Sequence, residues 1–367
     1  MADALKHMYN PGFFEKLCPV MRATIPKFDC QYFIHRIFNN QWPELELKQR
    51  VRHIAVTLHD FLPHDFPAAA SILVSLSHAL RRSEVTEQGF ATIFIPEYVH
   101  VYGLEHPEES LDALEEITQL VSAEFAVRPF LIQYPDLTMQ RMKEWSKHSN
   151  ANVRRLSSEG CRPRLPWAMG IPTLKKDPAP ILPILENLKA DPSEYVRRSV
   201  ANNLNDIAKD HPNLVLTIAK KWLGKNEDTN RIIKHGCRTL LKKGNEQVLG
   251  LHGYNPKSRG VLKAFELPKT KVKIGDQLNF SLAFVNKERT ATPYRLEYAI
   301  DYLTSTGKRS WKIFKITENE LEAGESITLV RKQSFKNLTT RKHFKGKHRL
   351  TILSNGKKVG AKEFMVC

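Results

Sequence analysis

Charged and amide side chains recur at helical spacing in three consecutive segments of the chain. In the segment around residues 193–206 they fall opposite Val196, Val200 and Ile207, on the face that a packed helix turns to solvent. The members of this polar face are Arg155, Glu159, Arg162, Arg198, Asn202, Asn205, Asp206, Arg231, His235 and Arg238. Because arginine forks match phosphate oxygens, three stacked faces of this kind predict a track for the phosphates of a nucleic acid.

A solvated surface with ion pairs along each helix would account for the same residues. Arg155 and Glu159, four positions apart, would form one such pair. For a single helix this interpretation is favoured, but three consecutive helices with the same residue types favour a shared surface. Carboxylates on a phosphate track repel the ligand, so Glu159 and Asp206 indicate chemistry in addition to binding, as a general base or as partners of a cation.

A stiff loop is predicted at residues 161–169, between two of these helical segments. Two prolines bar a continued helix there and hold Arg162, Arg164 and Trp167 close to Glu159. The indole of Trp167 would either plug the core between repeats or form an aromatic wall that faces a ligand. An aromatic face near carboxylates attracts cations, which favours a positively charged ligand in the second case.

The elements that must position these residues are helical up to about residue 250, with apolar residues three and four apart. Val-Arg-Arg occurs at 153–155 and again 43 residues later at 196–198, and Gly-Cys-Arg occurs at 160–162 and 236–238. Repeats of this period, each with two helices, are typical of HEAT-like repeats. Such repeats stack into a solenoid with a concave face, which suits an extended partner.

From about Lys263 the pattern changes to short alternations of apolar and polar residues, as in Leu278–Phe284. Asn355-Gly356 between two such runs predicts a two-residue hairpin. Roughly seven short strands in about 105 residues are typical of an immunoglobulin-like sandwich. We therefore expect a multidomain chain, with an all-α HEAT-like repeat solenoid over 1–255 and an all-β immunoglobulin-like sandwich over 256–367.

The formal net charge of the chain is +17 at pH 7. Residues 260–367 hold 22 Lys and Arg against 10 Asp and Glu, a net +12, and the remaining residues contribute +5. A strongly basic surface is typical of a protein that binds a polyanion, most often a nucleic acid. Five cations lie within nine residues of this segment, namely Arg341, Lys342, Lys345, Lys347 and Arg349. They predict either a solvated loop or, as we favour, a clamp on DNA phosphates.

The sequence carries no sign of a metal site, a cofactor or a membrane span. The five cysteines lack the short spacings of zinc sites and redox motifs, which predicts no structural metal and a reducing, cytoplasmic compartment. No run of 18 apolar residues occurs, and the N-terminus lacks the apolar stretch of a signal peptide. A solenoid that binds a duplex needs no second copy, so we expect a monomer.

Three segments carry a more specific signal. They are residues 124–130 (Glu-Phe-Ala-Val-Arg-Pro-Phe), 157–168 (Ser-Ser-Glu-Gly-Cys-Arg-Pro-Arg-Leu-Pro-Trp-Ala) and 196–209 (Val-Arg-Arg-Ser-Val-Ala-Asn-Asn-Leu-Asn-Asp-Ile-Ala-Lys). Together they resemble the AlkC/AlkD-type alkylbase DNA glycosylases, with the closer resemblance to AlkC. The likeness covers roughly residues 1–250, and some AlkC members carry an added immunoglobulin-like domain, in agreement with the predicted sandwich.

The resemblance implies a base excision repair enzyme that works on double-stranded DNA at the bacterial nucleoid. It implies hydrolysis of the N-glycosidic bond of cationic bases such as N3-methyladenine and N3-methylcytosine, without flipping the base, to leave an abasic site. It places Glu124, Glu159 and Asp206 near the lesion with Trp167 beside them, and it makes Arg155 and Arg162 contacts to the DNA backbone. Without the resemblance, Glu124 would be assigned as a partner of a helix N-terminus.

This reaction needs no general acid, because a base methylated at N3 is already a cation and a good leaving group. Carboxylates can stabilise an oxocarbenium-like sugar and orient a water molecule, as they do in glycosidases. An aromatic face further favours a cationic transition state by about 0.5–2 kcal/mol. We expect Asp206 or Glu159 to position the water and Glu124 to support the cation.

Two other functions fit parts of the sequence. A non-catalytic HEAT-repeat scaffold would bind DNA or a protein, and it gives no reason for Glu159 and Asp206 on a phosphate track. An RNA-binding module would use the β domain as its platform, but the aromatic residues there form no RNP-like motif.

Overall fold

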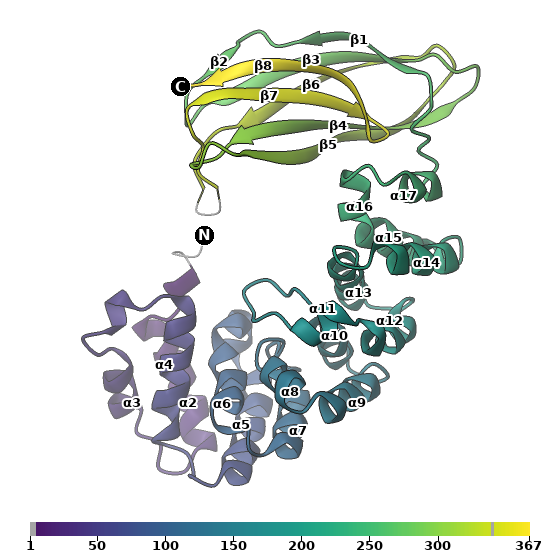
Figure 1. Ribbon diagram of the computed structural model, residues 1–367. Helices are drawn as coiled ribbons and strands as arrows, with labels where there is room; N and C mark the ends of the chain where they lie inside the picture. Colours follow the sequence, from purple (N-terminus) through teal and green to yellow (C-terminus); the bar gives the residue numbers. More distant parts are fainter. Residues whose placement is uncertain (1–4, 339–340) are drawn as a thin grey trace. The chain divides into compact units, whose positions relative to one another are not determined.

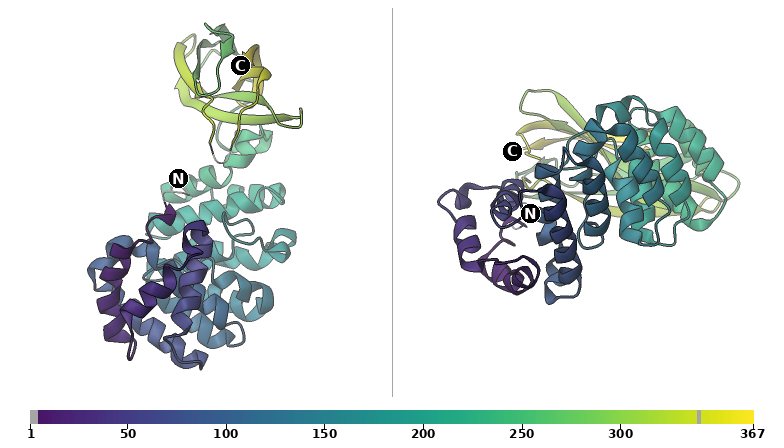
Figure 2. Two further views of the ribbon diagram at one scale, coloured as in Figure 1. Left: turned by 90° about the vertical axis from the view of Figure 1, so that its left-hand side faces the viewer. Right: turned by 90° about the horizontal axis from the view of Figure 1, so that it is seen from below.

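The computed structural model describes residues 5–338 and 341–367. The described chain forms two compact units, and each is considered by itself (Figure 1, Figure 2). The first unit runs to Asp210 and includes Leu223–Gly236, and the second consists of His211–Trp222 and Cys237–Cys367. Within the described residues, every helix is too short or too polar to cross a membrane.

The first unit is built from helices that stack side by side in chain order (Figure 1). Its α-helices are α2 (Pro11–Thr24), α3 (Cys30–Ile37), α4 (Leu47–His59), α5 (Phe66–Arg81), α6 (Phe94–Tyr102), α7 (Pro107–Ile117), α8 (Val127–Gln133), α9 (Pro135–Trp145), α10 (Ala151–Gly160), α11 (Pro172–Lys176), α12 (Leu182–Leu188), α13 (Glu194–Ile207) and α15 (Glu227–Gly236). Short 3-10 helices lie at η1 (Trp42–Glu44), η2 (Glu84–Ile93) and η3 (Ala179–Ile181). Helix α4 packs on α6, α5 on α7, α10 on α13 and α13 on α15, which confirms the predicted helical repeat.

The apolar face predicted for α13 is its buried face. Val196 and Val200 are 0% exposed and Ile207 is 1% exposed, so the opposite face is left for the polar residues. Helix α10 ends at Gly160, where a β-carbon would lie 2.7 Å from Val127 of α8 and 2.8 Å from Met142 of α9. A larger residue would push α10 away from these helices, so glycine sets how closely the Glu159 backbone approaches α8 and α9.

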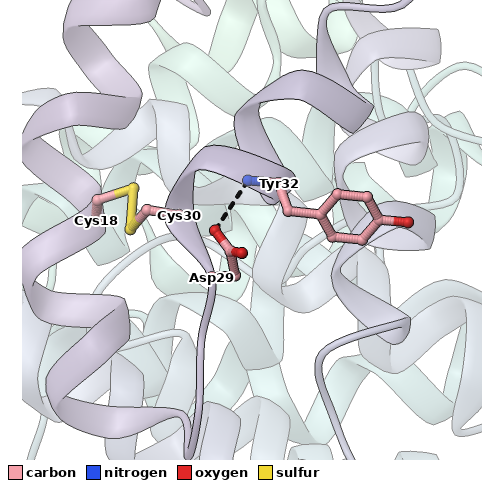
Figure 3. Close-up of a disulfide and its surroundings, with 4 residues drawn as sticks. All are labelled: Cys18, Asp29, Cys30 and Tyr32. Atoms are coloured by element: carbon pink, nitrogen blue, oxygen red, sulfur yellow. Dashed lines mark hydrogen bonds between the residues drawn. A yellow bond between two sulfur atoms is a disulfide. The ribbon is translucent and has the colours of Figure 1, made fainter.

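A disulfide joins Cys18 of α2 to Cys30, the first residue of α3 (Figure 3). The two Cα atoms are 5.8 Å apart and the residues are 12 positions apart in sequence. Asp29 caps α3, because its carboxylate accepts a hydrogen bond from the backbone N–H of Tyr32 at 3.0 Å. This pairing was not predicted from the sequence, where the cysteine spacings had indicated a reducing compartment. The cysteines therefore give no support for a reducing compartment.

In its described residues, the second unit contains three helices and two sheets, in which the strands pair antiparallel except for β2 with β8. The helices are α14 (Pro212–Trp222), α16 (Arg238–Lys242) and α17 (Glu246–Leu251). The strands are β1 (Gly260–Glu266), β2 (Lys271–Val272), β3 (Gln277–Asn286), β4 (Thr292–Leu303), β5 (Arg309–Leu321), β6 (Ser326–Ser334), β7 (Gly346–Ser354) and β8 (Lys357–Val366). One sheet has the order β1-β3-β6 and the other β2-β8-β7-β4-β5. Side chains from both sheets share one apolar core, which gives the predicted sandwich.

The buried positions and the hairpin turn of the sandwich agree with the predictions from the sequence. Leu278, Phe280, Leu282 and Phe284 of β3 are all buried, as their alternation predicted. Asn355-Gly356 is the two-residue turn between β7 and β8, with positive φ at both positions (47° and 80°), as a type I′ hairpin requires. The described residues hold eight strands where about seven were predicted, because β2 is only two residues long and pairs in parallel with β8.

The compact units do not coincide with the predicted boundary between residues 255 and 256. Helices α14, α16 and α17 belong to the second unit together with the strands. Asn355 illustrates the connection, because its Nδ2 donates to the carbonyl of Asn255 at 3.0 Å. The division at 255/256 stays a prediction of domain organisation.

Candidate active site

Three carboxylates of the first unit are linked through two arginines. Arg155 donates from Nη1 to Oε2 of Glu124 at 2.5 Å, and its Nη2 lies 3.6 Å from Oε1 of Glu159. Arg162 donates from Nη1 to the same Oε1 of Glu159 at 2.5 Å and from Nε to Oδ2 of Asp206 at 2.9 Å. Helices α10 and α13 and the turn before α8 thus bring together residues 124, 159 and 206, which the sequence analysis assigned to one site. We call these five residues the carboxylate–arginine chain.

The inner end of the carboxylate–arginine chain is buried. Glu159 is 4% exposed and Asp206 is 1% exposed. Their remaining oxygens are also bonded, because Ser199 Oγ donates to Glu159 Oε2 at 2.6 Å and Lys209 Nζ donates to Asp206 Oδ1 at 3.0 Å. Burial alone would lower the pKa of Arg162, but the charges and hydrogen bonds of Glu159 and Asp206 raise it, so this guanidinium stays charged.

The outer end of the carboxylate–arginine chain is more open. The side chain of Glu124 is 16% exposed, more than that of Glu159 or Asp206. Ser122 Oγ donates to its Oε2 at 2.8 Å, and among the described residues its Oε1 accepts no hydrogen bond. The guanidinium of Arg155 lies 4.6 Å from the ring centroid of Tyr195, a cation–π contact that holds it in place. Glu124 is therefore the carboxylate with an oxygen available to a ligand.

Trp167 lies on the surface and not in the core between repeats. Trp167 is 57% exposed, and its backbone has a φ of 65°, which bulky residues rarely adopt. Together with Ser122, Phe125 and Met169 it lines a mostly apolar cavity of about 160 Å³. Ser122 is also bonded to Glu124, so the cavity lining includes a residue that contacts the open end of the carboxylate–arginine chain. The exposure of Trp167 excludes the core plug, and an aromatic wall that faces a ligand stays a prediction.

Comparison with known proteins decides the family. Residues 261–367 match the family described as "Uncharacterised protein YhaZ, C-terminal Ig-like domain". The whole chain is 44% identical to "Uncharacterized protein YhaZ" of Bacillus subtilis (strain 168), with both proteins covered completely. The structure of Pseudomonas fluorescens alkylpurine DNA glycosylase AlkC, bound to DNA containing an abasic site analog, matches with a TM-score of 0.92 and 36% identity over 99% of each chain. The chain belongs to the AlkC family. The resemblance of the three sequence segments to AlkC and the immunoglobulin-like sandwich are thereby confirmed.

In this AlkC-family chain, two predicted DNA contacts lie exposed on neighbouring helices. The side chains of Arg198 on α13 and Arg231 on α15 are 65% and 68% exposed. Each is paired with a carboxylate one turn earlier, Arg198 with Glu194 at 2.9 Å and Arg231 with Glu227. Exposed pairs of this kind are worth little, about 0–1 kcal/mol, so a phosphate could displace either carboxylate.

The remaining predicted contacts on α13 and in the loop are already bonded within the protein. Asn202 Oδ1 lies 3.0 Å from Nε2 of His235 on α15. Arg164 donates two hydrogen bonds to Asp210, at 2.9 and 2.7 Å. Arg162 is 6% exposed, and its guanidinium is bonded to two carboxylates. It therefore stabilises these acidic residues and does not offer its guanidinium to a phosphate. Its contact with the DNA backbone stays a prediction.

One member of the predicted polar face belongs to a different helix from its expected neighbours. Helix α15 ends at Gly236, and Arg238 begins α16, which belongs to the second compact unit. The helical wheel that placed Arg238 with Arg231 and His235 ran through this helix end. Glycine weakens a helix because it lacks a side chain and has more backbone freedom to lose.

The basic cluster of the sandwich divides into bonded and unbonded cations. Lys347 and Arg349 both bond to Glu363, at 2.6 and 2.9 Å. The guanidinium of Arg341 lies 5.2 Å from the ring centroid of Tyr302. Lys342 and Lys345 are exposed. Within residues 5–338 and 341–367 they form no ion pair.

Sequence reasoning missed several residues that support the site. Ser199 and Lys209 bond to the buried carboxylates, and Arg128 is completely buried behind the Trp167 loop. Arg128 stands in the segment 124–130 that resembles AlkC, and this was the one available signal for it. In the described part of the chain, no three side chains of His, Cys, Asp or Glu gather in a way that could hold a metal ion.

Proposed function

We propose that this AlkC-family chain is a monofunctional DNA glycosylase that releases cationic alkylated bases, N3-methyladenine and N3-methylcytosine, from double-stranded DNA. The observation that carries the proposal is the carboxylate–arginine chain, which is more open at Glu124; the partner of Glu124, Ser122, lines the same cavity as Trp167. The protein is 36% identical, over 99% of both lengths, to an alkylpurine DNA glycosylase whose structure was solved with bound DNA. The protein would act in base excision repair as a monomer in the cytoplasm, at the nucleoid.

The reaction would be hydrolysis of the bond between C1′ of the sugar and the alkylated base. The base leaves with the electron pair of that bond and becomes neutral, because it was a cation before. Water adds its oxygen to C1′ and gives a proton to a carboxylate, which leaves an abasic site. The barrier lies in the positive charge that develops on the sugar, and fixed negative charge in a site of low dielectric stabilises it.

Each carboxylate would take a different part in this reaction. Glu124 would meet the sugar cation, because its Oε1 is available and its side chain is the most exposed of the three. Glu159 or Asp206 would position the water and accept its proton, as the sequence analysis expected. The face of Trp167 would favour the cation by about 0.5–2 kcal/mol. The resemblance to AlkC implies that the base would be attacked without being flipped, and the exposed position of Trp167 supports this.

DNA would be held by both units. On the first unit we assign phosphate contacts to Arg198, Asn202 and Arg231, whose partners are exposed and replaceable. Arg155, Arg162 and Arg164 would contribute positive potential. On the second unit, phosphate contacts are assigned to Arg238, Arg341, Lys342, Lys345 and Lys347.

The test is release of free base from a duplex that holds one N3-methyladenine or N3-methylcytosine. We would compare the wild type with Glu124→Gln, Glu159→Gln and Asp206→Asn. The expected result is base release by the wild type and a loss of about 10²–10⁴ in rate for the variant that lacks the water-positioning carboxylate. Glu297→Gln is the matched control, because it also removes a buried carboxylate beside an arginine, but in the sandwich.

The outcomes separate the two functions that the fold permits. Free base from the wild type and from Glu297→Gln, with a loss in the site variants while they still bind DNA, supports the glycosylase and ranks the carboxylates. Tight binding of the lesion duplex without base release by any protein would instead establish a non-catalytic scaffold and overturn the catalytic assignments.

A further inference from the structure

The loop that carries Trp167 is tied down by one buried arginine. Arg128 of α8 is 0% exposed. It donates from Nη1 to the carbonyls of Gly160 at 2.7 Å and Arg162 at 2.9 Å, and from Nε and Nη2 to the carbonyl of Met169 at 2.8 and 2.6 Å. One guanidinium thus joins the beginning of the loop to its end. Only a planar group with several fixed N–H donors can do this.

The environment of Arg128 is unusual for a buried cation. Among the described residues it donates no hydrogen bond to a carboxylate, and burial lowers its pKa to about 10. A buried charge held only by carbonyls is a costly way to stabilise a loop, since an apolar side chain could fill the same space. The arrangement is better explained by the geometry that it imposes on the backbone at residues 160–169.

The tip of the same loop is held from another helix. Lys48 of α4 donates from Nζ to the carbonyl oxygen of Trp167, 119 positions later in the chain. The ammonium also lies 5.6 Å from the ring centroid of Phe125, the neighbour of Glu124. Because Trp167 has a φ of 65°, its backbone conformation persists only where the surroundings hold it.

We propose that Arg128 and Lys48 are positioning residues that hold the Trp167 loop against the open end of the carboxylate–arginine chain. Arg128 fixes the two ends of the loop, and with them the backbone that follows Glu159. Lys48 fixes its tip, so that the indole borders the cavity beside Glu124. Neither residue contacts the reacting atoms. This inference rests on the proposed function only in its kinetic part, and the position of the indole is measured independently of it.

The chain contains a matched control for Arg128. Arg50 of α4 is 5% exposed and donates to the carbonyls of Leu45 at 2.9 Å, Lys6 at 2.8 Å and Trp42 at 3.4 Å. Its guanidinium lies 4.6 Å from the ring centroid of Trp42. It is therefore a similarly buried arginine beside a different tryptophan, and these hydrogen bonds go to carbonyls outside residues 160–169.

The experiment uses the full chain labelled with 5-fluorotryptophan, followed by ¹⁹F NMR. The five tryptophans give separate signals, and Trp167→Phe and Trp42→Phe assign the two that matter. Arg128→Lys keeps the positive charge but removes the planar set of N–H donors that joins the two ends of the loop. Lys48→Met removes the ammonium group of an exposed residue and keeps a side chain of similar length. We expect both to shift or broaden the Trp167 signal and to leave that of Trp42 unchanged. Arg50→Lys is expected to do the reverse.

The kinetic arm uses the lesion duplex under single-turnover conditions. Arg128→Lys is expected to lower the rate of base release roughly 10- to 100-fold, since small displacements at a reacting centre cost that much. The affinity for DNA should stay near that of the wild type, and Arg50→Lys should retain the wild-type rate. Should Arg128→Lys fail to fold, Lys48→Met decides the question.

Two results of the NMR comparison would overturn the inference, and one result of the kinetic arm would contradict it. One is an unchanged Trp167 signal in every folded variant of Arg128 and Lys48, and the other is a shift of the same size in Arg50→Lys. A displaced indole with an undiminished rate would also contradict it, because positioning would then have no consequence for the reaction. If the wild type releases no base, the proposed function fails, while the NMR comparison still tests whether these two residues hold the loop.

Discussion

The two units of the molecule each bury an arginine that bridges two carboxylates, with different surroundings. In the helical unit Arg162 joins Glu159 and Asp206, at 2.5 and 2.9 Å. In the sandwich Arg295 joins Glu297 at 2.6 Å and also Glu318. Both arginines are almost completely buried, at 6% and 5% exposure. A buried arginine between carboxylates therefore does not by itself mark an active site.

The two networks differ in where they end and in whether their buried atoms are bonded. Around Arg162 the carboxylate–arginine chain continues through Arg155 to Glu124, which is bonded to Ser122 in the lining of a cavity. Around Arg295 the network continues through Glu318 to the exposed Lys315, whose Nζ lies 3.6 Å from Glu318 Oε2. Inside the sandwich, the Nε of Arg295 and Oε2 of Glu297 have no hydrogen-bond partner. Both networks thus reach the surface, but only the second leaves buried polar atoms unsatisfied. We propose catalysis for the first network and a structural role for the second.

The largest expected effect comes from breaking both bridges in the same way. Arg162→Met and Arg295→Met each leave two acidic side chains without their main partner, so each should lower the free energy of unfolding by about 3–5 kcal/mol. Base release should fall at least roughly 100-fold in Arg162→Met only, because that variant alone disturbs the carboxylates of the proposed reaction. Urea unfolding gives the first quantity, and single-turnover base release at low temperature gives the second.

Equal losses of activity in the two folded variants would remove the distinction between the networks. A normal rate in Arg162→Met would show that Glu159 and Asp206 need no arginine to do their work, and the assignment of the site would then have to be revised.

The helical unit also shows how much of the site the sequence could predict. Residue types and their resemblance to AlkC were enough to select Glu124, Glu159, Asp206 and Trp167, because these are local motifs. The pairing of Arg162 with Asp206 spans 44 residues, and the helical wheel of one segment cannot contain a partner on another. Arginines that looked like phosphate contacts therefore proved to be bonded within the protein.

Elsewhere in the fold, too, the sequence predicted features whose signal is local and missed contacts between distant residues. The strands of the sandwich were predicted because alternation is a local property, as at Leu278–Phe284. The disulfide between Cys18 and Cys30 was missed, because a separation of 12 residues matches no recognised motif. The helical wheel that included Arg238 was wrong for a different reason, since it continued past Gly236, where α15 ends.

A smaller effect is expected from protonation of the unsatisfied network in the sandwich. Burial raises the pKa of Glu297, although the bond to Arg295 opposes the shift. Because the folded pKa lies above that of the unfolded chain, the folded state binds the proton more readily. The stability that comes from this proton is fully present below the unfolded pKa and is lost as the pH rises through the folded pKa.

Glu297→Gln should therefore behave differently on the two sides of this range. Relative to the wild type, the variant should be more stable at about pH 7.5 than at about pH 4.5, because glutamine removes a buried charge that is present only at the higher pH. Chemical unfolding of both proteins at the two pH values measures this difference. A difference that is independent of pH would mean that Glu297 keeps an ordinary pKa in the folded protein, and the two networks would then be electrostatically alike.

The smallest effect concerns the exposed cations of the sandwich, where bonded and unbonded residues stand side by side. Each phosphate neutralised by a cation contributes about 0.9 to the slope of log affinity against log salt. Lys342 and Lys345 have no ion pair among the described residues, whereas Lys347 is bonded to Glu363 at 2.6 Å. Replacing both free lysines by glutamine should lower the slope by up to about 1.8, and Lys347→Gln should change it by less than about 0.9 because its charge is already partly neutralised. Titration of duplex DNA from about 50 to 200 mM salt measures both slopes. Unchanged slopes in all variants would identify the cluster as a solvated loop, and DNA binding would then belong to the helical unit alone.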